Sequence, residues 1–107
     1  MQKKLKSSGN GWEFYFTKPI LKLLGYNPKE TNLLITSKNK TLYIEPIEEN
    51  DLERYKDNMV RKLQKSGCSY GLYLPAPLIE ILDVNPENDA IDVEICENKL
   101  FIKKYEC

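Results

Sequence analysis

The residues that most plainly offer chemistry are basic side chains grouped in two short arms of the sequence. No acidic residue precedes Glu13, and none lies between Asn58 and Ile79. The cations of the arms are Lys3, Lys4 and Lys6 in the first, and Arg61, Lys62 and Lys65 in the second. Polyanion binding depends on the local field, so a net charge of zero does not exclude it. The arms therefore predict contacts with nucleic-acid phosphates. The alternative is that these lysines only aid solubility.

The sequence offers no constellation for catalysis. It has no histidine, no nucleophile elbow, no phosphate loop and no carboxylate pair expected to share a cleft. Without histidine, the acids Asp92 and Glu94 predict a hydrated strand face rather than a metal site. We therefore expect no enzyme, no cofactor and no metal.

Cysteine usage and hydropathy predict a cytoplasmic protein without a membrane partner. Cys68, Cys96 and Cys107 are odd in number and far apart, which indicates neither a disulfide framework nor a metal pattern. A reducing compartment fits such cysteines best. No apolar run approaches the roughly 20 residues that span a bilayer.

The two arms occupy equivalent positions in an internal repeat. Lys3–Glu45 aligns with Arg61–Lys103 at a shift of 58 residues and without a gap. Identical pairs include Lys4/Lys62, Leu5/Leu63, Gly9/Gly67, Tyr15/Tyr73, Pro19/Pro77, Leu24/Leu82 and Ile44/Ile102. One such unit is near the size below which a domain is marginal, so the two copies are expected to share a core. We predict one pseudo-symmetric domain over 1–107, with repeat one at 3–47, an acidic linker at 48–60 and repeat two at 61–105.

Each repeat shows the same order of predicted elements. In the first repeat they are a strand at 3–8, a turn at 9–11, a strand at 12–16, a helix of barely two turns from Pro19, and a hairpin at 33–45. Alternation in the second strand places Glu13 and Tyr15 opposite the apolar side chains. Leu24 and Leu82 close the two helices and are predicted to lie in the core. The linker carries a thin apolar stripe that is compatible with a helix from Asn50 or Asp51.

This order of elements resembles the AbrB/MazE/SpoVT swapped-hairpin family. The resemblance is carried by KSGCSYGLYLPAPLIEILDVNPENDAIDVEICENKLFIKK and, more loosely, by KSSGNGWEFYFTKPILKLLGYNPKETNLLITSKNKTLYIEPI. It implies a mostly β fold with short helices, in which two units interlock into one β-barrel by swapping hairpins. Because both units stand in one chain, it also implies a monomer that acts as an internal pseudo-dimer.

Most members of that family bind DNA, as transition-state regulators or as antitoxins, through basic first strands and the turns that follow them. Carried over by position, the duplex-DNA contacts fall on Lys4, Lys6, Asn10, Arg61, Lys62, Lys65 and Ser69. Many members have a basic residue two positions before the proline that precedes the helix. This chain has Tyr15 and Tyr73 at those positions, and Thr17 replaces the proline that Pro75 keeps. Tyrosine can bond a phosphate or a base edge, but it brings no charge and releases no counterion.

Two functions from different classes remain open. The first is a DNA-binding transcriptional regulator, favoured by the acid-free basic arms and by the resemblance. The second is a protein-interaction module on the same fold, such as an antitoxin or an inhibitor. It is favoured by the zero net charge, the two tyrosines and the acidic second half. In an antitoxin, the linker at 48–60 would be the segment that binds a toxin.

Overall fold

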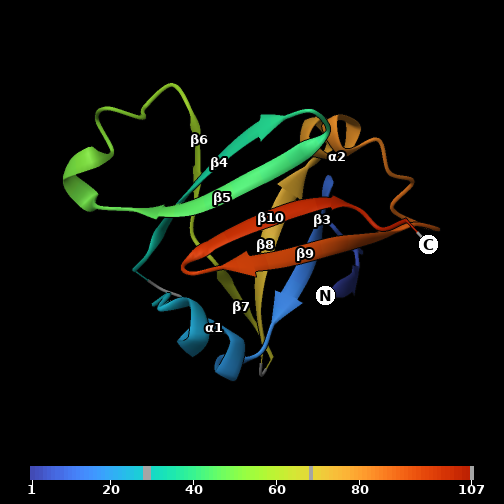
Figure 1. The fold of residues 1–107 in the computed structure, drawn as a ribbon, viewed down its shortest axis with the longest axis horizontal. Coiled ribbons are helices and arrows are strands. Elements are labelled where there is room, and N and C mark those ends of the chain that lie inside the picture. Colours follow the sequence, from blue (N-terminus) through green and yellow to red (C-terminus); the bar gives the residue numbers. More distant parts are fainter. Residues whose placement is uncertain (28–29, 68, 107) are drawn as a thin grey trace.

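Alternating apolar side chains build two β-sheets, which two short helices flank (Figure 1). The computed structural model describes residues 1–27, 30–67 and 69–106. The strands are β1 (Gln2–Lys4), β2 (Lys6–Ser8), β3 (Gly11–Phe16), β4 (Asn32–Lys38), β5 (Thr41–Ile47), β6 (Met59–Arg61), β7 (Gln64–Ser66), β8 (Ser69–Pro75), β9 (Ala90–Cys96) and β10 (Lys99–Lys104). The helices are α1 (Lys18–Leu24) and α2 (Ala76–Leu82), and a 3₁₀ turn, η1 (Glu49–Asp51), follows β5. The predicted mostly β fold with short helices is confirmed.

Both sheets combine strands from the two repeats. The larger sheet has the order β1-β9-β10-β5-β4-β6, and the smaller has the order β2-β3-β8-β7. All of their strand pairs are antiparallel, and β1–β9, β10–β5, β4–β6 and β3–β8 each join one repeat to the other. In Figure 1 the smaller sheet lies behind the larger one, and its strands cross those in front steeply. The two sheets enclose one core between them.

The strand registers place a pseudo-twofold axis through both sheets. In the smaller sheet Phe14 pairs with Leu72, the residue 58 positions later. In the larger sheet Tyr43 pairs with Phe101, which is again 58 positions later. An antiparallel pair between equivalent residues has a local twofold axis at that pair. The 58-residue spacing of the sequence is therefore also the relation between the two halves of the sheets.

The predicted closed barrel is wrong, because the first strand of each repeat is divided between the two sheets. The single strand expected at 3–8 leaves the larger sheet at Leu5 and enters the smaller one at Lys6. The second arm bends likewise between β6 and β7. Leu5 and its counterpart Leu63 are both 6% exposed, so each arm bends where a leucine enters the core. Bent arms connect the sheets, and backbone pairing in the described chain does not close them into a barrel.

The core consists of the inward-facing side chains of both sheets and one side of each helix. Its largest fully buried members are Phe14, Phe16, Leu33, Leu42, Ile44, Leu72, Leu74, Leu82, Ile91, Val93, Leu100 and Ile102. Phe14 and Phe16 contact each other edge to face, with their ring centroids 5.1 Å apart. Helices of seven residues are held by such packing rather than by their own propensity. Neither helix is long and apolar enough to cross a bilayer.

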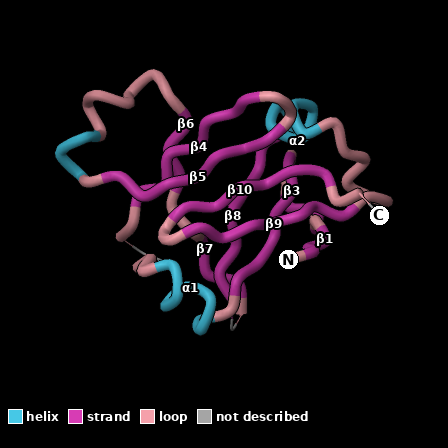
Figure 2. Tube along the Cα trace, in the orientation of Figure 1, coloured by secondary structure: helices cyan, strands magenta, loops and turns pink. Residues whose placement is uncertain are grey.

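The linker is not the α-helix considered from its sequence. Only the turn η1 forms, and irregular turns follow it as far as Asn58 (Figure 2). Leu52 and Tyr55 are only half-buried, so the thin apolar stripe gains too little packing to sustain a helix. Of the cysteines, Cys96 is free and exposed, while Cys68 and Cys107 lie outside the described residues.

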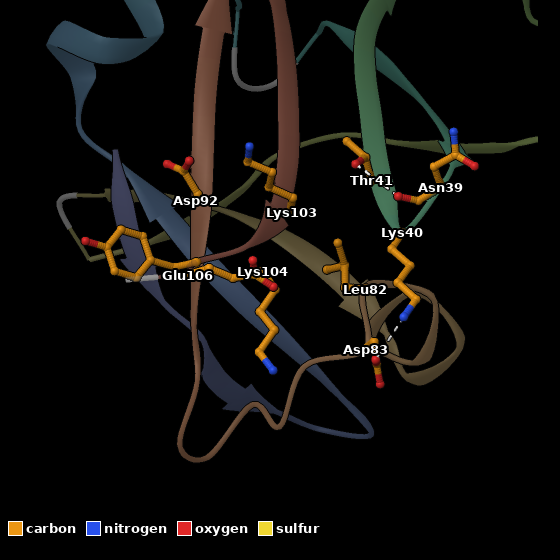
Figure 3. A pocket seen from close by; sticks show the side chains of 10 residues that line it. Asn39, Lys40, Thr41, Leu82, Asp83, Asp92, Lys103, Lys104 and Glu106 are labelled. Atoms are coloured by element: carbon orange, nitrogen blue, oxygen red, sulfur yellow. Dashed lines mark hydrogen bonds and ion pairs between the residues drawn. The ribbon is translucent and has the colours of Figure 1, made fainter.

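Each helix end is tied to the hairpin turn of the other repeat. After α1, the buried Tyr26 hydroxyl donates a 2.6 Å hydrogen bond to the Asn98 carbonyl in the β9–β10 turn. After α2, Asp83 accepts a 3.3 Å hydrogen bond from the Lys40 ammonium in the β4–β5 turn (Figure 3). The same contact is thus buried and neutral at one end but exposed and charged at the other. We expect the Tyr26 bond to contribute more to stability.

The two predicted core leucines provide a direct test of the helix faces. Leu24 is 2% exposed and Leu82 is 1% exposed, whereas the neighbouring Leu23 is 69% exposed. Leu24→Ala or Leu82→Ala should lower the free energy of unfolding by about 2–5 kcal/mol, since each leaves a cavity. Leu23→Ala should change it by less than about 0.5 kcal/mol. Urea unfolding followed by circular dichroism measures all three, and equal losses would contradict this assignment.

Tyr26 predicts a specific alkaline sensitivity. Burial, and then the negative charge of Glu45, raise the pKa of Tyr26 from 10.0 to about 12. Between those pH values the folded protein keeps a proton that the unfolded chain releases, so stability falls as pH rises through this window. Tyr26→Phe removes this titration. Its free energy of unfolding should start about 0.5–1.5 kcal/mol lower at pH 8.

Between pH 10 and 12, the stability of Tyr26→Phe should then fall less steeply than that of the unmodified protein. Urea unfolding at a series of pH values measures both slopes. Tyr105→Phe, at an exposed position, is the matched control and should follow the unmodified protein. Parallel curves for the Tyr26 variant and the unmodified protein would show that Tyr26 does not titrate as described.

Candidate nucleic-acid interface

Ion pairing is concentrated on the larger sheet and the turns at its ends. The pairs there are the Met1 amino group with Asp92 (3.1 Å), Lys40 with Asp83 (3.3 Å), Lys99 with Glu45 (3.6 Å), Lys104 with Asp89 (3.7 Å) and Lys103 with Glu94 (3.9 Å). Within the described ranges, none of the six cations of the two arms forms an ion pair. Among the described residues, the lysines of β10 at positions 99, 103 and 104 are therefore compensated and the arm cations are not, although Lys3, Lys4 and Arg61 themselves stand on strands of the larger sheet.

Beside the smaller sheet, each of the equivalent tyrosines Tyr15 and Tyr73 holds a cation, although Lys6 and Arg61 come from non-equivalent positions of the two arms. The Lys6 ammonium lies 5.6 Å from the centroid of the Tyr15 ring, and the Arg61 guanidinium lies 5.8 Å from that of Tyr73. Contacts of this kind hold a cation near an aromatic face without neutralising it. Tyr15 and Tyr73 are half-buried, so each ring packs partly on the sheet and partly contacts its cation and solvent. Both cations remain available to an anionic ligand.

The other predicted lysines near the bends differ in how firmly they are held. Lys3 donates a 2.9 Å hydrogen bond to the Tyr15 carbonyl and lies 5.9 Å from the Phe16 ring centroid. It is therefore engaged with the fold. Lys4 and Lys62 are exposed, at the ends of β1 and β6, near opposite edges of the smaller sheet. Three strand spacings make that sheet roughly 14 Å wide.

The two turns expected to contact bases lie at opposite ends of the smaller sheet. Asn10 is exposed in the β2–β3 turn, at the end where Gly11 pairs with Pro75. Ser69 is half-buried at the start of β8, close to the end where Phe16 pairs with Tyr70. The length of β3 separates these ends by roughly 20 Å. The structure therefore does not gather both turns into one cluster but gives each arm its own turn.

Lys65 lines a hollow with a residue that the sequence prediction omitted. The hollow has a volume of about 370 Å³ and lies between the start of α1 and the β7–β8 turn. Its lining comprises Thr17, Lys18, Pro19, Lys65, Gly67 and Tyr70. The sequence allows Lys18 either to border a binding face or to lie on a solvated helix surface, and its uncharged counterpart Ala76 favours the second. No sequence signal links Lys18 to Lys65, because only the fold brings α1 beside β7.

Glu13 is the second residue that sequence reasoning passed over. It lies on the outer face of the smaller sheet, yet it is only 7% exposed. Its carboxylate covers Gly71, the residue equivalent to it in the second repeat: a Cβ at Gly71 would lie 2.5 Å from Glu13 Oε2 and 3.0 Å from the Tyr15 ring. The absence of a side chain at Gly71 therefore makes the space that Glu13 fills. The alternation of β3 identified its face, but the burial depends on β8.

Comparisons with known proteins do not identify the chain. It matches no protein-family model, no curated protein and no solved structure. The described residues also contain no group of three or more His, Cys, Asp or Glu side chains arranged to hold a metal ion. The function of the chain must therefore be inferred from the geometry and the charges of its two sheets.

The fit between Glu13 and Gly71 is testable by a double-mutant cycle. Gly71→Ala should lower the free energy of unfolding by about 1–3 kcal/mol, because the new methyl group overlaps Glu13 and Tyr15. Adding Glu13→Ala should recover part of this loss, with a coupling energy of about 0.5–3 kcal/mol.

Gly11→Ala is the matched control for this cycle. There the clash is with the Leu74 carbonyl oxygen, 2.7 Å from the added Cβ, and with the Tyr73 side chain. Removing the Glu13 side chain should recover much less of that loss, because the Leu74 carbonyl oxygen belongs to the backbone and cannot move aside as a side chain can. Urea unfolding of the single and double variants measures both cycles. Additive effects of Glu13→Ala and Gly71→Ala would show that the two positions do not share space.

Proposed function

We propose that this protein is a DNA-binding regulator that contacts duplex DNA with the smaller sheet and the two basic arms at its edges. The observation that carries the proposal is the separation of charge. Lys99, Lys103 and Lys104 of β10 pair with carboxylates, whereas the arm cations have no such partner among the described residues. Unpaired, exposed cations are the groups that exchange condensed counterions for phosphates. Lys4, Lys6, Arg61, Lys62 and Lys65 supply them.

The symmetric placement of the two arms about the pseudo-twofold axis favours duplex DNA as the ligand. The axis passes between β3 and β8 at Phe14 and Leu72, so the arms approach a ligand from opposite edges. The smaller sheet, roughly 14 Å wide, is comparable with a major groove of about 12 Å. Phosphates on both sides of the groove would then face the two arms. Asn10 and Ser69, at opposite ends, would each serve one half-site.

We also propose that the two hairpins are exchanged in the manner of the swapped-hairpin family, although in two open sheets. Support comes from the pairing of β5 with β10 on the pseudo-twofold axis, and from the contact of α2 with β5 and β3 of the other repeat. Such an exchange gives one chain the two arms that a homodimer would provide. The protein would then bind DNA as a monomer, with its repeats as half-site readers.

Charge removal in the arms tests the proposed function. With four to six phosphate contacts, log K against log salt should have a slope of roughly −4 to −5. The double variant Lys4→Gln/Lys62→Gln should bind all duplex sequences more weakly and make the slope less steep by about 2. Fluorescence anisotropy with a labelled duplex pool at several salt concentrations measures both.

The control variant is Lys99→Gln/Lys103→Gln, which removes the same net charge from the ion-paired larger sheet. Its slope should match that of the unmodified protein. If the unmodified protein shows no salt-dependent binding to any duplex at low ionic strength, the regulator proposal is wrong. Equal effects of the two double variants would place the interface elsewhere.

A second candidate is a protein-interaction module that uses the linker. The segment from Glu48 to Asn58 projects from the sheets (Figure 2) and carries five acidic residues against two basic ones. Of its residues, Glu48, Glu49, Glu53 and Asp57 are exposed. This segment would suit a basic partner surface, as in an antitoxin. It becomes the leading proposal if duplex binding is not found.

A further inference from the structure

Glu13 is a nearly buried residue whose carboxylate lacks a polar partner within the protein. It is 7% exposed, and in the described chain neither a hydrogen bond nor an ion pair reaches its side chain. Lys6 is its cross-strand neighbour, but the Lys6 ammonium lies beside the Tyr15 ring instead. In the described chain no fully buried side-chain oxygen lacks a partner, so the unpaired Glu13 oxygens keep contact with solvent and can accept a hydrogen bond from a ligand.

The surroundings of Glu13 indicate the kind of donor that would fit. Lys6 and Arg61 lie over the flanking tyrosines, so a cationic group approaching Glu13 would meet like charge. The ligand should therefore bring negative charge to Lys6 and Arg61 and an uncharged N–H donor to Glu13. A polyanion that carries neutral N–H groups does both, because its phosphates can pair with the cations while an N–H group donates to the carboxylate. In duplex DNA the exocyclic amino groups of cytosine and adenine in the major groove are such donors.

We propose, on the basis of the proposed DNA-binding function, that Glu13 determines sequence specificity by accepting a hydrogen bond from the N4 amino group of a cytosine in the major groove. Glu13 lies on β3, one residue from Phe14 on the pseudo-twofold axis, so it would face a base pair near the centre of the site. A two-stranded antiparallel ribbon such as β3–β8 is an element that the major groove admits. Carboxylates are suited to cytosine N4 and unsuited to the O6 of guanine and the O4 of thymine, which are acceptors.

Because Gly71 stands at the equivalent position, only one of the two half-sites would be recognised in this way. The preferred sequence would then be asymmetric close to its centre, although the sheet itself is pseudo-symmetric. Glu13 contacts no phosphate in this arrangement. Its loss should therefore change which sequences bind and leave the salt dependence unchanged.

Selection from a randomised duplex pool tests this inference, with the unmodified protein, Glu13→Gln and Glu13→Ala. The unmodified protein should enrich cytosine at one central position and bind that site roughly tenfold or more tightly than a thymine-substituted one. Glu13→Ala should bind the two sites equally. Glu13→Gln, which keeps the side-chain shape, should shift the preference toward adenine, because its amide pairs with adenine N6 and N7. Glu80→Gln, at an exposed position on α2, is the control and should select the original sequence.

The outcomes separate this inference from the proposed function. If Glu13→Gln and Glu13→Ala, shown to be folded by circular dichroism, select the same sequence as the unmodified protein, Glu13 does not contact a base. If the unmodified protein binds duplexes with salt dependence but selects no sequence, the inference is also wrong while the DNA-binding proposal stands. If Glu13→Ala does not fold, the shift expected of Glu13→Gln decides the question.

Discussion

The antiparallel pairing of β3 with β8 is the interaction on which the rest of the structure depends. It joins the two repeats at Phe14 and Leu72, and both of these side chains are fully buried. A single repeat could not bury its apolar face in this way, since a unit of this size has too little interior. The same pairing fixes the pseudo-twofold axis and places β2 and β7 at opposite edges of the sheet. The fold and the arrangement of the arms therefore have one common cause.

The cations of β10 and those of the arms are held by different kinds of contact. The outer face of the larger sheet carries the Tyr43–Phe101 ring contact, with ion pairs on either side of it. Exposed pairs of this kind add little stability, but they leave little net field. In the arms, Lys6 and Arg61 lie beside tyrosine rings and Lys3 donates to a backbone carbonyl, so these contacts take the place of carboxylates. Such contacts hold a cation in place and preserve its charge for a ligand.

Equivalent core positions of the repeats stay buried even where their residue types differ, as at Phe14 and Leu72, whereas the candidate sites differ in charge. Leu5 and Leu63 are equally buried at the two bends, and Leu24 and Leu82 close the two helices equivalently. Glu13 faces Gly71, however, and a second carboxylate on that diagonal would crowd and repel it. The hollow at Lys18 and Lys65 is likewise unmatched, since its counterparts Ala76 and Ser7 carry no charge. The two halves of the fold are thus related by pseudo-symmetry but carry different side chains at their candidate sites.

The sequence by itself determined the strands, the short helices, the core leucines and the positions of the basic arms. Each of these depends on local periodicity or on residue type, and the 58-residue shift relates the equivalents directly. Only the tertiary structure decided that the first strands bend at Leu5 and Leu63 to leave two open sheets. Each strand continues evenly along the chain, and the bend depends on which neighbour it pairs with. The burial of Glu13 was decided in the same way, since a side chain's exposure depends on the strand opposite it, which here is β8 with a glycine.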